Sequence, residues 1–153
     1  MKEIFRKLGL LALLVMLLSA FTACGGTDDF SSTTVISGLE YNGSYTTAED
    51  VSAYLREYGQ LPGNFITKSQ ARDLGWEGGG LEEYAPGCCI GGDKFGNYEG
   101  LLPEESGRRY YECDINTLGK DSRGAERLVY SNDGLIYYTP DHYESFELLY
   151  GDD

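Results

Sequence analysis

Residues 126–139 have the sequence ERLVYSNDGLIYYT, which contains the clearest turn signal in the chain. Two runs rich in aliphatic and aromatic residues flank Asn132-Asp133-Gly134, a combination typical of a tight hairpin. We therefore expect antiparallel strands at 126–131 and 135–139.

The rest of the chain divides at about Gly87 into a helical part and a strand part. Three more strands are expected at 88–94, 108–114 and 143–148. Before them, Thr47 can cap and Gly59 can end an amphipathic helix over 48–58. A capping box from Thr67 to Gln70 begins a second short helix that Gly75 closes. Helices followed by strands predict an α+β fold, with N-terminal helices packed on a five-stranded antiparallel sheet.

The N-terminus has the composition of an export signal. Basic residues precede a short apolar run in residues 1–23, as in a secretory signal peptide. Residues 21–25 (FTACG) resemble a bacterial lipobox that would place lipid on Cys24, although Phe21 replaces the usual Leu; the alternative is an ordinary signal cut elsewhere. Residues 24–45 are expected to form a flexible tether and residues 46–153 a single domain. The predicted location is extracellular or anchored to the outer face of the membrane.

The chain is strongly acidic, with a net charge of −13. Residues 1–23 hold three basic residues and one acidic residue, so the remainder has nine Lys and Arg against 24 Asp and Glu, a net charge of −15. Such a charge opposes binding to polyanions. Arg123 and Arg127 nevertheless stand four residues apart in a chain short of cations, which indicates either an anion site or ion pairs with the many carboxylates.

Four other features are candidates for chemistry, namely three single residues and one loop. His142 is the single histidine, and its side chain suits proton transfer near neutral pH, although a lone histidine can be structural. Lys68 stands in the first turn of a helix, where a cation is unfavourable, so it either has another role or is simply solvated. Glu112 is one carboxylate of many. The spacing of Cys88, Cys89 and Cys113 does not suit zinc, and we expect no metal site.

The fourth feature is the loop Phe95-Gly96-Asn97-Tyr98-Glu99-Gly100. Its backbone N–H groups could donate to a purine, the Glu99 carboxylate could accept from the base, and Tyr98 could stack on it. The alternative is a plain hairpin loop with an exposed tyrosine.

These signals occur in order within a pattern that resembles barnase and related guanyl-preferring ribonucleases over the whole 108-residue domain. The matching residues are Asp50-Val51, Tyr54-Leu55, Leu61-Pro62, Ile66-Thr67-Lys68-Ser69, Leu74-Gly75-Trp76, Ala85-Pro86-Gly87, Ile90-Gly91-Gly92-Asp93, Asn97, Glu99-Gly100, Leu102-Pro103, Ser106-Gly107-Arg108, Asp114-Ile115-Asn116, Arg127, Tyr130-Ser131, Leu135-Ile136-Tyr137 and Asp141-His142-Tyr143.

The resemblance implies an enzyme without cofactor or metal that cleaves RNA after guanine. Glu112 would act as general base and His142 as general acid. Lys68, Arg123 and Arg127 would stabilise the transition state. The base would be bound by residues 95–99, with Tyr143 packing on the opposite side of the site. By the same resemblance, Asp93 and Asp114 would position the arginines and strand residues, and Asp133 would pair with Arg108.

The sequence also departs from the family. Gly96 and Tyr98 replace Ser and Arg, so the loop is more like that of the fungal guanyl ribonucleases, and the segment before Arg123 is one residue longer. The cysteines have no family role; a bridge from Cys113 to Cys88 or Cys89 is expected, with a Cys88–Cys89 bridge as the alternative. Expected partners are RNA and a barstar-like protein inhibitor, and a monomer is expected. The other hypotheses are a noncatalytic surface lipoprotein and a toxin with an immunity protein.

Overall fold

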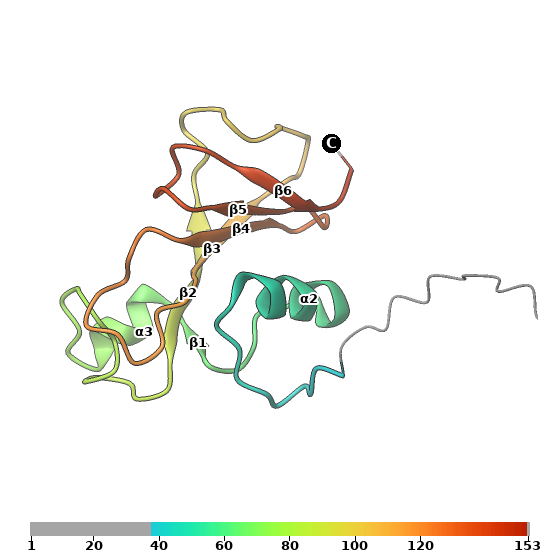
Figure 1. Cartoon of the computed structure of the whole chain (residues 1–153). Helices are drawn as coiled ribbons and strands as arrows, with labels where there is room; N and C mark the ends of the chain where they lie inside the picture. The colour runs from blue at the N-terminus through green and yellow to red at the C-terminus, as the bar shows by residue number, and fades with distance from the viewer. Residues whose placement is uncertain (1–37, 153) are drawn as a thin grey trace, which may run out of the picture. The chain divides into compact units, whose positions relative to one another are not determined.

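The computed structural model describes residues 38–152, which lie within one compact unit. Its elements are α2 (Ala48–Tyr58), β1 (Phe65–Ile66), α3 (Lys68–Asp73), β2 (Cys89–Phe95), β3 (Tyr110–Asp114), β4 (Arg127–Ser131), β5 (Ile136–Thr139) and β6 (Glu147–Tyr150) (Figure 1). Both helices precede the main strands along the chain, so the α+β class is confirmed.

The sheet has six strands in the order β1-β2-β3-β4-β5-β6, one more than expected. The additional strand is β1, which pairs in parallel with β2 through Phe65 and Ile66, while every other neighbouring pair is antiparallel. Two residues are too few to show the alternation by which a strand is recognised in a sequence. The prediction of five strands was therefore wrong in number, although its five strands are present.

The hairpin around Asn132-Asp133-Gly134 is confirmed. The Ser131 N–H donates to the carbonyl of Leu135 at 2.9 Å, and Tyr130 pairs with Ile136. The last strand begins four residues later than expected, at Glu147. His142 and Tyr143 have positive φ values of 59° and 76°, and Asp141 accepts from the Ser145 N–H at 2.9 Å. These residues form a turn that cannot continue a strand.

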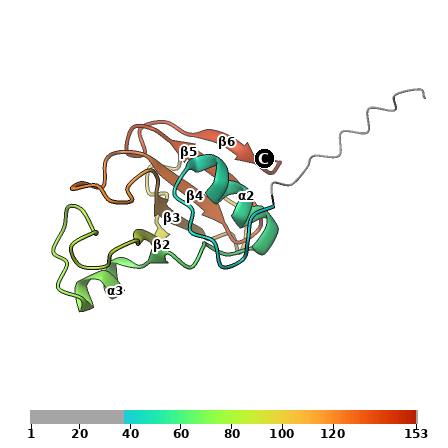
Figure 2. The same cartoon turned by 60° about the horizontal axis from the view of Figure 1, so that its bottom comes forward.

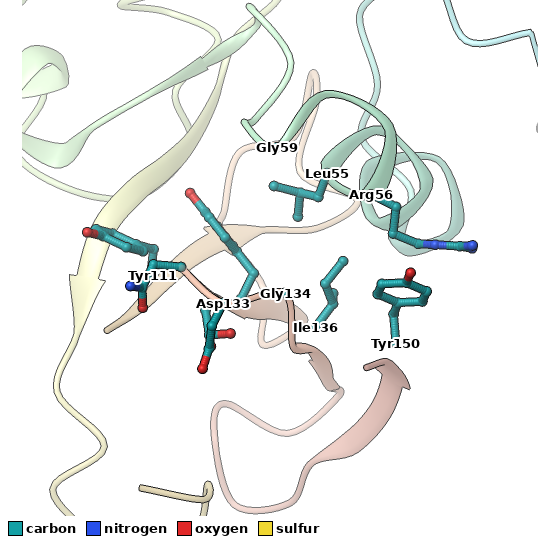
Figure 3. Close-up of a pocket in the computed structure, with 11 residues that line it drawn as sticks. Leu55, Arg56, Gly59, Tyr111, Asp133, Gly134, Ile136 and Tyr150 are labelled. Atoms are coloured by element: carbon teal, nitrogen blue, oxygen red, sulfur yellow. The ribbon is translucent and has the colours of Figure 1, made fainter. Parts of the chain in front are cut away.

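Helix α2 covers one face of the sheet (Figure 2). Thr47 accepts from the Asp50 N–H, and Gly59 ends the helix at φ 67°, so the predicted helix 48–58 is confirmed with its caps. Its buried face contributes Val51 and Leu55 to a core that also contains Cys113, Leu128, Ile115 and Ile136. Beyond the C-terminal end of α2, the same face of the sheet is open as a pocket (Figure 3).

The opposite face of the sheet carries a second core, formed by Leu102, Tyr110, Val129, Leu135 and Tyr137. Successive residues of a strand point to opposite faces. In β3, Tyr110 and Cys113 therefore mark the two sides, and Glu112 and Asp114 lie on the side of Tyr110, away from α2.

The expected bridge from Cys113 to Cys88 or Cys89 is absent from the described part of the chain, where all three cysteines are free thiols. Strands β2 and β3 are neighbours as predicted, but the residue opposite Cys113 is Gly91. A Cβ on Gly91 would lie 2.6 Å from the Cβ of Cys113, so this position requires glycine. Burial raises the pKa of the Cys113 thiol.

Residues 39–45 are bound to the folded unit. Tyr58 and Tyr54 donate to the carbonyls of Leu39 and Tyr41, both at 2.7 Å, and the Tyr45 N–H donates to Asn64 at 3.2 Å. The packed chain therefore begins before the boundary expected at Thr46. The signal peptide and Cys24 lie outside the described residues. Within residues 38–152, no helix has the length and apolarity needed to cross a membrane.

Candidate active site

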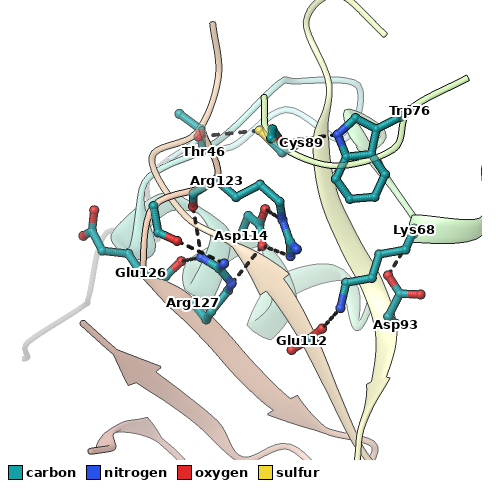
Figure 4. Close-up of polar contacts among 12 residues, drawn as sticks. Thr46, Lys68, Trp76, Cys89, Asp93, Glu112, Asp114, Arg123, Glu126 and Arg127 are labelled. Atoms are coloured by element: carbon teal, nitrogen blue, oxygen red, sulfur yellow. Dashed lines mark hydrogen bonds and ion pairs between the residues drawn. The ribbon is translucent and has the colours of Figure 1, made fainter. Parts of the chain in front are cut away.

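The centre of the site is Glu112, which β3 presents on the face opposite α2. The Glu112 side chain is 10% exposed, and its two oxygens have different partners. Oε1 accepts from the Lys68 ammonium and Oε2 from the Tyr143 hydroxyl (Figure 4 draws the first of these). A carboxylate with both oxygens held by donors has a fixed orientation, as a positioned base requires.

Lys68 reaches Glu112 from the first turn of α3. The capping box from Thr67 to Gln70 is confirmed, with the Thr67 N–H donating to Gln70 at 2.8 Å. The Lys68 N–H donates to the Asp93 carboxylate at 2.9 Å. Asp93 therefore brings a negative charge to the helix N-terminus, which offsets the unfavourable position of the lysine. Lys68 is thus paired with Glu112 and not simply solvated, while its part in the chemistry stays a prediction.

Next to Glu112 on the same face, Asp114 binds both arginines (Figure 4). Its carboxylate accepts from Arg123 Nε at 2.6 Å and from Arg123 Nη2 at 2.8 Å. Arg127 Nε lies 2.9 Å from the same carboxylate. Asp114 and Arg127 are almost fully buried, whereas the Arg123 side chain is 23% exposed. Arg123 is therefore the cation of this pair that a ligand can approach.

Arg127 also holds the loop that carries Arg123. Its guanidinium donates to the carbonyls of Arg123 at 3.1 Å, Gly124 at 3.1 Å and Glu126 at 2.7 Å. These bonds use the buried donors of Arg127 within the protein, so the side chain shapes the loop and supplies a fixed positive charge behind it.

His142 lies on the turn between β5 and β6 and is exposed to solvent. Its N–H donates to the carbonyl of Ala125 at 3.1 Å, within the same loop as Arg123. Its ring centroid lies 4.8 Å from that of Tyr143. The single histidine is therefore attached by its backbone to the cationic loop, with its ring beside the tyrosine that binds Glu112.

Tyr143 connects the parts of the site. Burial raises the pKa of its hydroxyl, the Glu112 carboxylate raises it further, and the Arg127 guanidinium lowers it in part. Asp114 holds the pKa of Arg123 above its usual value, with smaller contributions from Tyr143 and Glu112. The charges of Glu112 and Arg127 therefore act on the Tyr143 hydroxyl, and those of Glu112 and Tyr143 act on Arg123. The ring of Tyr143 also packs against Phe95, with centroids 5.2 Å apart.

Phe95 begins the loop that was predicted to bind a base. Asn97 shapes this loop, because its amide donates to the Leu102 carbonyl at 2.9 Å and accepts from the Leu102 N–H at 3.0 Å. Its side chain is thus engaged by the loop itself. Tyr98 is 94% exposed and its ring lies over Gly96, while Glu99 is exposed. Tyr98 and Glu99 are the side chains of this loop that remain accessible.

Sequence reasoning missed three residues that organise the site. Glu126 accepts from Asn116 at 3.1 Å and from the Tyr138 hydroxyl at 2.7 Å, which fixes the end of the cationic loop. Thr139 and Asp141 hold the histidine turn: the Tyr143 N–H donates to Thr139 at 2.9 Å, and Thr139 donates to Asp141 at 2.9 Å. The position of Glu126 between Arg123 and Arg127 in the sequence was the signal that could have pointed to its role.

Two other expectations concern charge and metals. The predicted ion pair between Arg108 and Asp133 is confirmed, at 2.8 Å. Within the described range, no group of three or more His, Cys, Asp or Glu side chains is placed to hold a metal ion.

The fold and the comparisons with known proteins define a microbial, barnase-like ribonuclease. The chain belongs to the ribonuclease family, whose model matches residues 48–150. The ribonuclease of Heyndrickxia coagulans is 55% identical over 102 residues, which are 65% of this chain and 93% of that protein.

In other relatives the match spans a smaller share of the protein. The ribonuclease of Bacillus intermedius is also 55% identical over 102 residues, and the match spans 62% of that protein. Guanyl-specific ribonuclease St of Saccharopolyspora erythraea is 46% identical over 57 residues, 37% of this chain and 56% of that protein. A solved structure of ribonuclease Sa2 with mononucleotides is 35% identical, with a TM-score of 0.34 over 38% of this chain and 60% of that chain.

Proposed function

We propose that the chain is an endoribonuclease that cleaves single-stranded RNA after guanine without a metal ion. The observation that carries the proposal is the fixed Glu112 carboxylate, bound by Lys68 and Tyr143 beside the Asp114–Arg123–Arg127 cluster. Membership of the ribonuclease family supports the reaction class.

In the proposed reaction, Glu112 removes the proton from the ribose 2′-OH, whose oxygen attacks the adjacent phosphorus. The bond to the 5′ oxygen breaks, and His142 gives that oxygen a proton, which leaves a 2′,3′-cyclic phosphate. Water then opens the cyclic phosphate while the two residues exchange roles. Arg123, Arg127 and Lys68 stabilise the negative charge that develops on the phosphoryl oxygens. DNA lacks the 2′-OH and is therefore bound but not cleaved.

Guanine is assigned to the loop of residues 95–99. Backbone N–H groups would donate to the base, Glu99 would accept from its N1–H and N2–H₂ groups, and Tyr98 would stack on it. Phe95 and Tyr143 would form the wall next to Glu112, and Gly96 and Asn97 would shape the loop. The exposure of Tyr98 and Glu99 supports this assignment. A relative whose name specifies guanyl specificity supports the preference.

The test is cleavage of an RNA oligonucleotide with a single guanine, in EDTA. We expect one cut, after the guanine, and loss of this cut in Glu112→Ala. Glu57→Ala is the matched control, because Glu57 is also a glutamate but lies exposed on α2, away from Glu112 and the loop of residues 95–99. Equal background cleavage by wild type and Glu112→Ala would show that the proposal is wrong. Tight RNA binding without turnover would favour the noncatalytic alternative.

The place of action is proposed from the first residues. Export follows from the signal peptide, and lipid on Cys24 would anchor the enzyme to the outer face of the membrane. Cys24→Ala should release the protein into the medium if the anchor exists, and cell fractionation measures this. If the protein stays with the membrane in both forms, the lipid is not on Cys24.

A barstar-like inhibitor is the proposed protein partner, as expected of a toxin paired with an immunity protein. The acidic surface would oppose a similarly acidic inhibitor at long range, but physiological salt screens charges beyond about 8 Å. An adjacent reading frame whose product blocks RNA cleavage would establish this role. Sedimentation tests the expected monomer.

A further inference from the structure

A row of aromatic residues crosses the face of the sheet that is opposite Glu112. Lys94 pairs with Tyr111, Tyr111 with Tyr130, Tyr130 with Ile136, and Ile136 with Tyr150. Residues directly opposite one another on neighbouring strands project to the same face. The row therefore spans β2 to β6, a width of about 19 Å at the usual strand spacing.

The rings of this row form the floor and one end of a pocket of about 520 Å³ (Figure 3). Tyr111 and Tyr130 are half-buried and stacked, with ring centroids 5.7 Å apart at 29°. Ile136 is buried between Tyr130 and Tyr150, and Tyr150 is 44% exposed. Leu55 and Gly59, at the end of α2, form the opposite wall.

A cation stands at each end of the row. The guanidinium of Arg56 lies 4.2 Å from the ring centroid of Tyr150, and Lys94 is exposed next to Tyr111. They are two of only nine Lys and Arg residues after residue 23. The acid in the pocket, Asp133, is already paired with Arg108 at 2.8 Å. The local charge therefore differs from the acidic average of the surface.

We propose that this row is a second nucleic-acid contact, which binds a single strand of RNA outside the cleavage site. Planar rings with a cation at each end of the row fit a polymer of bases and phosphates, because bases stack on aromatic faces and phosphates pair with cations. An acidic peptide would use the cations but leave the rings without a planar partner. The contact is independent of cleavage chemistry, since Tyr111 and Glu112 project to opposite faces of β3.

Binding to the row is measured with the DNA oligomer (dA)12, which has bases and phosphates but no 2′-OH and no guanine. Fluorescence anisotropy of labelled (dA)12 at low salt gives the Kd. We expect Tyr111→Ala and Tyr150→Ala each to weaken binding about tenfold, as removal of a stacking ring does. Tyr84→Ala, which removes an exposed tyrosine from another loop, should leave the Kd unchanged.

A second pair of variants removes the cations of the row and leaves its rings in place. Arg56→Gln and Lys94→Gln change exposed side chains, and each should reduce the slope of log K against log salt by about 0.7. Turnover of a GpU dinucleotide, which is too short to reach the row, should be the same in all these variants. Turnover of a long RNA at limiting concentration should fall in parallel with (dA)12 affinity.

Each failure has a separate meaning. If wild type binds (dA)12 no better than the Tyr111→Ala, Tyr150→Ala double variant, the second contact does not exist. A change of sedimentation mass in Tyr150→Ala without a change in (dA)12 affinity would identify a second copy of the chain as the occupant and overturn the proposal. Row-dependent binding of (dA)12 without RNA cleavage would instead refute the proposed enzyme and leave this inference standing.

Discussion

The backbone N–H of His142 donates to the carbonyl of Ala125 at 3.1 Å, so the proposed acid is attached to the loop that carries the exposed cation Arg123. Its φ of 59° is one that histidine, asparagine and aspartate adopt more readily than other side chains. Replacement of His142 by asparagine can therefore remove the imidazole while the backbone turn is kept.

His142→Asn should keep the turn and lose the acid. We expect kcat for RNA to fall by about 10²–10⁴, with the free energy of unfolding changed by less than about 1 kcal/mol. A guanosine 3′-(4-nitrophenyl phosphate) substrate should lose far less activity, because its leaving group needs no proton. Equal losses for both substrates would remove His142 from the role of acid.

Asp114→Asn should destabilise the protein through both arginines. The carboxylate is 1% exposed and is the shared ionic partner of Arg123 and Arg127. Loss of one member of a buried ion pair costs about 3–5 kcal/mol, and urea unfolding measures it. Asp133→Asn, which breaks the more exposed pair with Arg108, is the control and should cost about 1 kcal/mol or less. If the two variants unfold alike, the Asp114 cluster does not hold the loop.

Gly96→Ala should change substrate binding more than stability. A Cβ on Gly96 would lie 2.2 Å from Tyr98 Cε2, and the exposed ring can swing away at little cost. We expect KM for a guanine dinucleotide to rise several-fold, while the urea midpoint stays the same or increases slightly. Tyr98→Ala should raise KM similarly, and the double variant should add nothing further. Additive effects on KM would show that Gly96 acts independently of Tyr98.

Asp141 should contribute to stability at neutral pH and not in acid. Its pKa lies below the usual value, first because Ser145 donates to it from its hydroxyl and backbone, and also because Thr139 donates to it. The stabilisation is thus present above the unfolded pKa of about 3.9 and is lost as pH falls through the lower folded pKa. Urea midpoints should rise less between pH 2 and 5 in Asp141→Asn than in wild type or Glu144→Gln. An unchanged rise would refute the assignment.

Tyr138, whose hydroxyl donates to Glu126, should contribute to stability at neutral pH and not at high pH. The hydrogen bond to Glu126 and burial raise the pKa of Tyr138 to about 12. A raised pKa gives stabilisation that is complete below the unfolded pKa of about 10 and disappears as pH rises to about 12. Tyr138→Phe should therefore be less stable than wild type at pH 8 and more nearly equal at pH 12, as measured by urea unfolding. Tyr84→Phe is the control, and an equal difference at both pH values would contradict the prediction.

The sequence predicted elements whose cause is local. The helix 48–58 has its caps and apolar spacing within a dozen residues, and the hairpin of β4 and β5 is specified by three turn residues. Glu112, Lys68 and His142 were candidates from residue type and family position. The ion pair of Lys68 with Glu112, and the position of Tyr143 between Glu112 and His142, depend on which segments lie side by side, and that information is not local.

The remaining features depend on tertiary structure. The two-residue strand β1 exists because β2 lies beside it, and Gly91 rather than a cysteine faces Cys113 because of the register between β2 and β3. The two hydrogen bonds between the Asn97 amide and the Leu102 backbone, which shape the predicted base-binding loop, could not be read from the sequence. The role of Glu126 required Asn116 and Tyr138 to converge on it from two other parts of the chain.

Strand β3 alternates Tyr110, Tyr111, Glu112, Cys113 and Asp114 between two surfaces that do different work. Insertion of one residue into this strand would turn every following side chain to the other side. Glu112 and Asp114 would then face the apolar interior under α2, and Cys113 would face the arginines. The number of residues in β3 is therefore constrained by both surfaces at once.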